Sequence, residues 1–254
     1  YNNDSMYRIH SKNITIGLTI FILGLFKKVV LADGISVYAS PVFNAAEIGT
    51  QLTLFEAWVG AIAYSFQLYF DFSGYSDMAI GIARMFGVKL PLNFNSPYKA
   101  TNISDFWRQW HMTLSRLIRD YLWDPISLKM TRYAVNNNYN AFGMFSLTIV
   151  IPILFSFFWI GLWHGAGWNF IIFGMIHGMY IVSHNIWKTA TNRVNFRLNS
   201  TICWLITFIA VTFSWVPFRA ESIDGALNMF NAMFGFNGLS ISKSLLGNIG
   251  VAED

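Results

Sequence analysis

The stretch FGMFSLTIVIPILFSFFWIGLW, residues 142–163, decides the fold class of this chain. It carries no charged side chain, and as a helix it is long enough to cross the roughly 30 Å hydrocarbon core of a bilayer. Pro152 lies inside it and predicts a kink, because proline removes one backbone hydrogen bond of a helix. The stretch therefore predicts a membrane-spanning helix.

Four further apolar segments follow the same pattern and bring the number of expected spans to five. They cover residues 14 to about 31, 52–70, 168–182 and 202–216. The last two segments are short, which is typical of tilted or re-entrant helices. Lys27 and Lys28 lower the apolar character of the segment 14–31. We therefore expect an all-α, polytopic transmembrane protein.

The composition supports this fold class and excludes several others. Of 254 residues, 54% are hydrophobic and 12% are charged, against about 25% charged in an average soluble domain. The mean hydropathy is +0.42. These values exclude a disordered chain, a coiled coil, a disulfide scaffold and an ordinary soluble domain. The single cysteine, Cys203, excludes an intramolecular disulfide and a cysteine-based zinc site, and we expect no metal.

The extent of the chain predicts one incomplete domain. Residues 1–254 contain no tandem repeat or low-complexity tract, so we expect a single membrane-embedded domain. The sequence begins at Tyr1, without a methionine or a signal peptide. We therefore expect a C-terminal fragment whose N-terminal helices are missing.

The basic residues predict the orientation in the membrane. The net charge of +4 is explained by lysines and arginines that flank the spans, so a nucleic-acid partner is not expected. The long polar stretch 73–141 is rich in them, and the loop 183–199 carries Lys188, Arg193 and Arg197 without an acid. The positive-inside rule places both loops in the cytoplasm. The turn of residues 163–167 then faces the opposite side.

The polar stretch 73–141 predicts two helices. The first covers residues 75–86 with an amphipathic pattern, and Gly87 is expected to end it. The second starts near Asn102 or Ser104 and ends before Pro125.

The second of these helices carries a polar face. A spacing of four residues puts its side chains on one face: Trp107, His111, Ser115 and Arg119. Two interpretations remain open, burial in a polar interior and an amphipathic helix at the membrane surface.

His164 is the candidate catalytic residue. It lies between Trp163 and Gly165 at a predicted helix break within apolar sequence, and ionisable groups at membrane depth indicate function by default. Burial keeps an imidazole neutral, and a neutral imidazole is a general base. The alternative is a hydrogen-bonded structural histidine.

The other histidines receive simpler interpretations. His177 is assigned first to helix packing and second to a polar role, while His10 and His184 are read as surface residues. The sequence contains no Gly-x-Ser-x-Gly, His-Glu-x-x-His or Gly-Lys-Ser/Thr motif, which argues against serine hydrolases, zinc peptidases and nucleotide hydrolases.

Five separated segments resemble the membrane-bound O-acyltransferase family. They are FDFSGYSDMAIG (70–81), LNFNSPY (92–98), DFWRQWHMTLS (105–115), RDY (119–121) and GLWHGA (161–166). The segment WVPFRA (215–220) is similar to a late signature of the branch that O-acetylates alginate, peptidoglycan and other polysaccharides. The resemblance covers about residues 14 to 236.

The resemblance implies a fold and roles for individual residues. The family fold is a ring of tilted and short helices around a membrane-embedded tunnel. His164 matches the essential histidine of the family and His111 matches its second histidine, so both are expected to line one tunnel. His164 is then expected to act as the base or, alternatively, as a relay residue that receives the acyl group. Supporting roles are expected for neighbouring residues: Trp107, Trp110 and Trp163 as cavity walls, Ser115 on the polar face, and Arg119 with Asp120 as charges that hold their helix.

The resemblance also implies an activity. A cytoplasmic acyl thioester such as acetyl-coenzyme A donates an acetyl group, which passes to hydroxyls of a polysaccharide or to an extracytoplasmic acetyltransferase partner. The protein is then a multi-pass enzyme of the bacterial cytoplasmic membrane with no permanently bound cofactor. D-alanyl transfer to teichoic acid, a transporter and a membrane scaffold are the alternatives. The absence of an inverted repeat disfavours the transporter.

Overall fold

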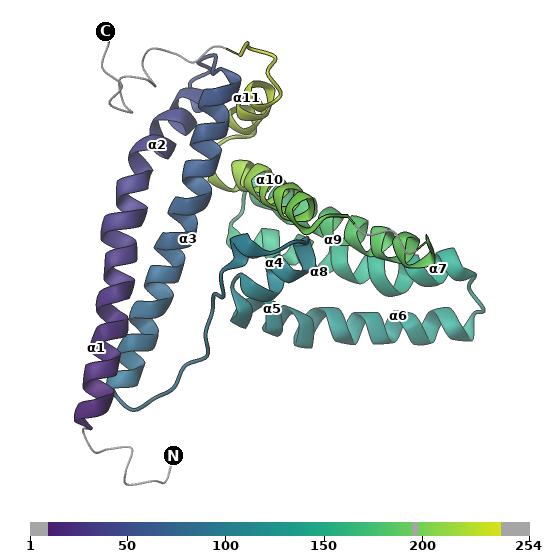
Figure 1. Cartoon of the computed structure of the whole chain (residues 1–254). Helices are drawn as coiled ribbons and strands as arrows, with labels where there is room; N and C mark the ends of the chain where they lie inside the picture. Colours follow the sequence, from purple (N-terminus) through teal and green to yellow (C-terminus); the bar gives the residue numbers. More distant parts are fainter. Residues whose placement is uncertain (1–9, 195–197, 240–254) are drawn as a thin grey trace. The chain divides into compact units, whose positions relative to one another are not determined.

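The computed structural model describes residues 10–194 and 198–239, and every regular element in these residues is a helix (Figure 1). The predicted all-α class is confirmed. The chain forms two compact units, one from the described parts of Tyr1–Asn93 and Arg219–Asp254 and one from Phe94–Phe218.

Four helical stretches in the described residues are long and apolar enough to cross a membrane. They are Ser11–Glu47, Ala141–His164, Trp168–Thr191 and Ser200–Arg219. These contain four of the five expected spans. The remaining expected span, 52–70, lies in α3 (Leu54–Met85), which is longer but less apolar and carries Glu56, Asp71 and Asp77.

The first unit begins with a helix that is longer than expected. α1 (Ser11–Phe26), the π-helical turn η2 (Lys27–Ala32) and α2 (Asp33–Glu47) follow one another without a break. The predicted span ended near residue 31, and the expected loop after it is helical. Pro41 lies within α2 and does not end it.

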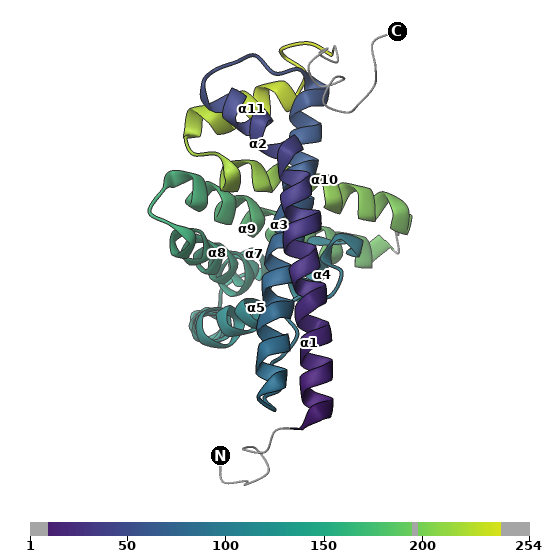
Figure 2. The ribbon, with the colours of Figure 1, turned by 90° about the vertical axis from the view of Figure 1, so that its left-hand side faces the viewer.

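Glycines bring α1 and α3 into backbone contact, and the two helices lie side by side in both views of the ribbon (Figures 1 and 2). A Cβ added to Gly17 would lie 2.5 Å from the carbonyl oxygen of Gly81, and one added to Gly24 would lie 2.6 Å from that of Gly74. Small residues allow such close approach between membrane helices. The glycine pairs therefore fix the register of the two helices.

The same register pairs the charges within the first unit. Lys27 lies 2.6 Å from Asp77, and Lys28 lies 2.6 Å from Asp71 and 3.0 Å from Asp33. Charged groups within a membrane-spanning helix need partners because lipid does not solvate them. These ion pairs explain why two lysines are tolerated in the first span.

α3 joins two elements that the sequence separated. The expected span 52–70 and the expected amphipathic helix 75–86 form one helix that ends at Gly87, which has φ +79°. The N–H of Gly87 donates to Arg84 and that of Val88 to Ala83, both at 2.9 Å. This pattern is a Schellman motif, so Gly87 ends the helix as predicted.

α11 (Ile223–Met233) completes the first unit and is tied to the end of α2. The carboxylate of Glu47 accepts hydrogen bonds from the N–H of Glu221 at 2.7 Å and from the hydroxyl of Ser222 at 2.6 Å. Ser222 also caps α11 by accepting from the N–H of Gly225.

The second unit contains the remaining elements. They are η3 (Pro97–Lys99), α4 (Ile103–Gln109), α5 (Met112–Ile118), η4 (Arg119–Trp123), α6 (Asp124–Asn136), α7 (Ala141–Phe145), η5 (Ser146–Val150), α8 (Ile151–His164), α9 (Trp168–Val194) and α10 (Ser200–Arg219). α8 and α9 form a helical hairpin around residues 165–167. The glycines of this hairpin again allow close packing, since a Cβ on Gly174 would meet the carbonyl oxygen of Phe157.

The irregularity expected at Pro152 takes the form of a π-helical turn. α7, η5 and α8 are continuous, and η5 ends just before the first turn of α8, where Pro152 lies. Pro152 has no N–H to donate to Thr148, four residues earlier. The hydroxyl of Ser127 on α6 donates to that carbonyl at 2.8 Å instead, which ties α6 to this span.

Candidate active site

His164 lies at the helix break that the sequence predicted. It is the last residue of α8, and α9 begins at Trp168. The half-buried imidazole is surrounded by aromatic rings, with centroid distances of 4.9 Å to Trp163, 5.0 Å to Phe218 and 5.8 Å to Phe173. Neither ring nitrogen has a hydrogen-bond partner within the described part of the chain. The imidazole is therefore free to exchange a proton with a bound molecule.

His111 lies in a break that the sequence did not predict. α4 ends at Gln109, Trp110 is extended, and His111 has φ +43° and ψ 55°, the left-handed conformation. The prediction of one continuous helix through His111 is wrong. A non-glycine residue in this conformation costs of the order of 1–3 kcal/mol. The burial of Trp110, whose ring lies 5.0 Å from that of Trp215, opposes that cost.

The turn at His111 also breaks up the expected polar face. Trp107 is buried against α9, while Arg119 is exposed and lies 3.3 Å from Asp120, its neighbour in sequence. The hydroxyl of Ser115 donates back to the carbonyl of Trp110 at 3.3 Å. Residues four apart share a face only along an unbroken helix, yet Trp107, Ser115 and Arg119 line one cavity. The spacing argument therefore fails for His111, which does not line it.

Pro125 does not end the second helix. η4 continues directly into α6, and Pro125 occupies the first turn of α6. Pro125 has no N–H to donate to Tyr121, four residues earlier, and the π-helical turn η4 lies at this point of the continuous helix, as η5 does before Pro152. The predicted start of this helix near Asn102 is confirmed, because the side chain of Asn102 accepts a hydrogen bond from the N–H of Asp105 at 2.9 Å.

His111 and His164 are close enough to interact electrostatically, although they lie far apart in the sequence. Burial lowers the pKa of His111 to about 4, so its imidazole is neutral at pH 7. Its Nδ1 lies 3.4 Å from the hydroxyl of Thr113. The second unit therefore brings together the two histidines that the family resemblance singled out.

His177 is a buried hydrogen-bonding centre that joins three helices. The indole N–H of Trp107 on α4 donates to Nδ1 at 3.2 Å, and Nε2 lies 2.7 Å from the hydroxyl of Ser214 on α10. Ser214 donates its own proton to the carbonyl of Val211 at 2.7 Å. Nδ1 must therefore accept and Nε2 must carry the proton, which fixes one neutral tautomer.

Aromatic side chains surround this network. Phe173 on α9 lies 4.8 Å from the ring of His177 and 5.2 Å from that of Trp215, and it also contacts His164. Phe106 stacks on Trp110 at 5.6 Å. The same aromatic cluster thus supports the break at His111, the ring of His177 and the ring of His164.

The three predicted wall tryptophans have different environments. Trp107 lines a cavity in the second unit, Trp110 is buried in the aromatic cluster and does not line that cavity, and Trp163 is 65% exposed beside His164. Ser115 and Arg119 line the same cavity as Trp107, whereas Asp120 does not.

From the sequence, helix packing ranked above a polar role for His177, whereas in the structure its hydrogen bonds join three helices. A histidine flanked by Gly174 and Gly178 within an apolar helix was the available signal, but its partners come from distant helices. Of the two predicted surface histidines, His10 is exposed and His184 is half-buried beside a second cavity. The side chains of Arg193 and Arg197 lie outside the described residues.

The site is an arrangement of imidazoles and aromatic rings. Among the residues that the structure describes, no group of three or more His, Cys, Asp or Glu side chains is placed to hold a metal ion. The unprotonated ring nitrogen of a neutral His164 can accept a proton, and the neutral imidazole of His111 can donate or accept a hydrogen bond.

Comparison with known proteins gives consistent matches over most of the chain. The peptidoglycan O-acetyltransferase of Helicobacter pylori is 44% identical over 233 residues, which cover 92% of this chain and 41% of that protein. A protein of Pseudomonas putida named "Probable alginate O-acetylase AlgI" is 41% identical over 89% of this chain and 43% of its own length. The teichoic acid D-alanyltransferase of Bacillus subtilis is 32% identical over 64% of this chain and 39% of its own length.

The chain thus spans about two-fifths of the length of these curated relatives. The sequence model of the membrane-bound O-acyltransferase family matches residues 1–220, a range that contains His111, His164 and His177. The match agrees with the resemblance carried by the five motifs, and the chain belongs to the membrane-bound O-acyltransferase family.

Proposed function

We propose that the protein transfers an acyl group, with acetyl as the expected group, from a thioester donor to hydroxyls of a polysaccharide such as peptidoglycan or alginate. The observation that carries this proposal is His164, an imidazole with unpartnered nitrogens at a helix break, within electrostatic range of the neutral imidazole of His111. The names of the peptidoglycan and alginate relatives support the acceptor class.

The proposed chemistry gives each histidine a distinct role. His164 takes the proton of the acceptor hydroxyl while the hydroxyl oxygen attacks the thioester carbonyl. The new C–O bond forms, the C–S bond breaks, and the proton passes from His164 to the departing thiolate. His111 donates a hydrogen bond that orients the donor or polarises its carbonyl. Aromatic rings around His164 exclude water, which would otherwise hydrolyse the thioester.

The membrane separates donor from acceptor in this proposal. The protein is a multi-pass membrane protein, and we place it in the bacterial cytoplasmic membrane with the basic stretches 73–141 and 183–199 in the cytoplasm. The second stretch was expected as a loop, but its residues 183–194 are the last turns of α9. The thioester donor, such as acetyl-coenzyme A, enters from the cytoplasm and binds as a substrate. An extracytoplasmic acetyltransferase partner receives the acetyl group or completes its transfer to the polymer.

A cysteine at position 192 tests this orientation. Asn192→Cys in a Cys203→Ser background is expected to react with a membrane-impermeant thiol reagent only after the cells are opened. Labelling from outside intact cells would reverse the orientation and, with it, the side to which His164 opens.

D-alanyl transfer to teichoic acid is the second candidate. Two teichoic acid D-alanyltransferases support it, and both are 32% identical to this chain. The relative from Bacillus subtilis covers 64% of the chain and the one from Streptococcus thermophilus covers 52%. The O-acetyltransferase relatives match with higher identity over a larger share of the chain, and they favour acetyl transfer. Direct assays with acetyl and D-alanyl thioesters in the same membranes separate the two activities.

Replacing the candidate base tests the activity itself. His164→Ala, as the sole copy of the complete protein, is expected to abolish acetylation of the polymer while the protein is retained in the membrane. His184→Ala is the matched control, because this histidine lies on α9 away from the His164 ring. Polymer acetylated to the wild-type level by His164→Ala would favour a scaffold, and solute uptake without acetyl transfer would favour a transporter.

A further inference from the structure

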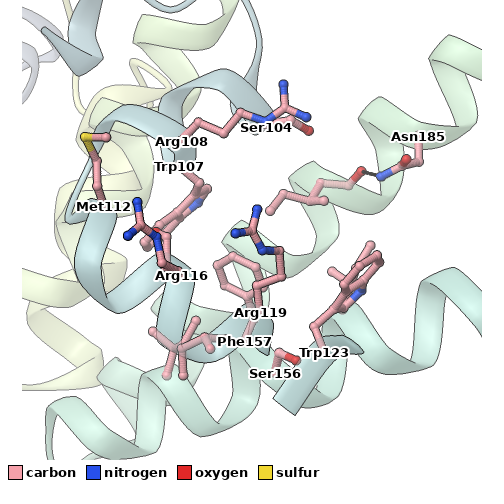
Figure 3. Close-up of a pocket in the computed structure, with 15 residues that line it drawn as sticks. Ser104, Trp107, Arg108, Met112, Arg116, Arg119, Trp123, Ser156, Phe157 and Asn185 are labelled. Atoms are coloured by element: carbon pink, nitrogen blue, oxygen red, sulfur yellow. Dashed lines mark hydrogen bonds between the residues drawn. The ribbon is translucent and has the colours of Figure 1, made fainter. Parts of the chain in front are cut away.

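A cavity of about 380 Å³ lies within the second unit, between α4, α5, η4, α8 and α9 (Figure 3). Met112, the residue after His111, lines it, and so does Trp107, the partner of His177. The cavity therefore shares a wall with the candidate active site.

The charged side chains of this lining are all cationic. Arg108, Arg116 and Arg119 contribute guanidinium groups, and no acidic residue is among the described residues that line the cavity. Arg108 and Arg119 have carboxylate neighbours outside the lining, Asp105 at 2.9 Å and Asp120 at 3.3 Å. Arg116 forms no ion pair within the described part of the chain. The cavity thus favours an anion.

Two buried polar groups in the lining lack partners. The hydroxyl of Ser156 and the indole nitrogen of Trp123 have no hydrogen-bond partner within the residues that the structure describes, and Ser156 is only 2% exposed. More than nine in ten buried polar groups in proteins are hydrogen-bonded. A molecule bound in the cavity would supply the missing partners. Figure 3 shows both side chains beside Arg119.

The donors in the cavity define the chemistry of its ligand. Guanidinium and indole groups only donate hydrogen bonds, and the hydroxyl of Ser156 can donate one. A matching ligand is therefore rich in acceptor oxygens and negatively charged. Guanidinium groups match the oxygens of phosphate with two parallel hydrogen bonds.

We propose that this cavity binds a phosphate ester, with Arg116 and Arg119 pairing its charge and Ser156 and Trp123 donating hydrogen bonds to its oxygens. Two sources share this chemistry: the phosphate groups of an acyl-thioester carrier and the headgroup of an anionic phospholipid. The carrier source rests on the proposed function, and it would place the donor beside the wall formed by Trp107 and Met112. The phospholipid source does not depend on the proposed function.

The binding experiment uses the complete protein in phosphatidylcholine nanodiscs. The first arm titrates desulfo-coenzyme A, which carries the phosphates but no thiol, and measures its dissociation constant by calorimetry. The second arm uses nanodiscs in which a minor share of the lipid is phosphatidylglycerol, and it measures enrichment of that lipid around the protein by mass spectrometry of bound lipid. Arg116→Gln is expected to weaken binding about 10-fold or more in one arm, because a charged hydrogen bond is lost. Arg132→Gln on α6, outside the cavity, is the matched control for charge.

Ser156→Ala separates ligand binding from folding. An unpartnered hydroxyl has no hydrogen bond to lose, so the thermal unfolding temperature without ligand is expected to stay equal or rise. The same change is expected to weaken phosphate binding by roughly 2- to 10-fold, since one ligand hydrogen bond disappears. A purely structural role for Ser156 would lower the unfolding temperature of the alanine variant and leave phosphate binding as in the wild type.

The outcomes distinguish the two sources and the two proposals. Weaker binding of desulfo-coenzyme A to Arg116→Gln, with a raised KM for the thioester and an unchanged kcat, supports the carrier source. If Arg116→Gln loses phosphatidylglycerol enrichment but binds desulfo-coenzyme A like the wild type, the headgroup source is supported. If Arg116→Gln and Ser156→Ala behave like Arg132→Gln in both arms, the phosphate site is refuted. His164→Ala is expected to retain both forms of binding, so its loss of transfer tests the proposed function separately.

Discussion

The indole N–H of Trp107 donates to Nδ1 of His177 at 3.2 Å, and this contact connects α4 to α9 in the interior of the second unit. Because Ser214 holds the opposite nitrogen at 2.7 Å, the imidazole is fixed from both sides. Trp107 precedes the break at His111, and Phe173, one turn before His177, packs on His164. The Trp107–His177 contact thus supports the geometry of both candidate catalytic residues.

Replacing His177 is expected to lower the stability of the protein. His177→Phe keeps the aromatic packing but leaves the N–H of Trp107 without a partner, and the hydroxyl of Ser214 keeps only its bond to the carbonyl of Val211. Each unsatisfied buried group costs about 1–3 kcal/mol. Thermal unfolding in detergent measures the loss. In a double-mutant cycle, Trp107→Phe combined with His177→Phe is expected to cost less than the sum of the two single changes; additive costs would contradict the hydrogen bond.

The two candidate catalytic histidines are expected to differ in the size of their effects. His164→Gln removes a general base and is expected to lower the transfer rate by about 10²–10⁴-fold. His111→Gln retains a hydrogen-bonding group and is expected to lose less, about 5- to 150-fold for an orienting bond of roughly 1–3 kcal/mol. Steady-state transfer rates, normalised to folded protein, measure both. A greater loss of rate in His111→Gln than in His164→Gln would mean that His111 is the general base and His164 the orienting residue.

The environment of His111 predicts a dependence of stability on pH. Burial lowers its pKa in the folded protein to about 4, below about 6.5 in an unfolded chain. Between these values the unfolded chain binds more protons, so this residue contributes stability that is lost as pH falls from about 6.5 to 4. Thermal unfolding followed across this range is expected to show a shallower fall for His111→Gln. His10→Gln, at an exposed histidine, is the control, and an equal slope in both variants would refute the assignment.

The glycine contacts between α1 and α3 predict opposite effects for two alanine substitutions. Gly24→Ala places a methyl group 2.6 Å from the backbone oxygen of Gly74, so the helices must separate and the unfolding temperature is expected to fall. At Gly34→Ala nothing lies within 4 Å, and the helix is expected to gain up to about 1 kcal/mol from the better propensity of alanine. Unfolding in detergent compares the two. Equal effects would show that the close approach of the helices does not matter for stability.

The sequence by itself determined the all-α class, the presence of four apolar spans, the break at His164 and the stop at Gly87. Each of these depends on local chemistry. Apolar length decides whether a helix can cross a bilayer, and glycine adopts the left-handed conformation at a helix end without steric cost. The family membership likewise followed from motifs that are contiguous in the chain.

Tertiary structure decided what local patterns could not. The turn at His111 depends on the burial of Trp110 against Trp215 on a distant helix, so propensity for a continuous helix was overridden by packing. The polar role of His177 depends on Trp107 and Ser214, which come from two other helices. A hydrogen bond between residues far apart in sequence leaves no periodic signal in the chain. Only the fold brings such groups together, and it is the fold that places His111 near His164.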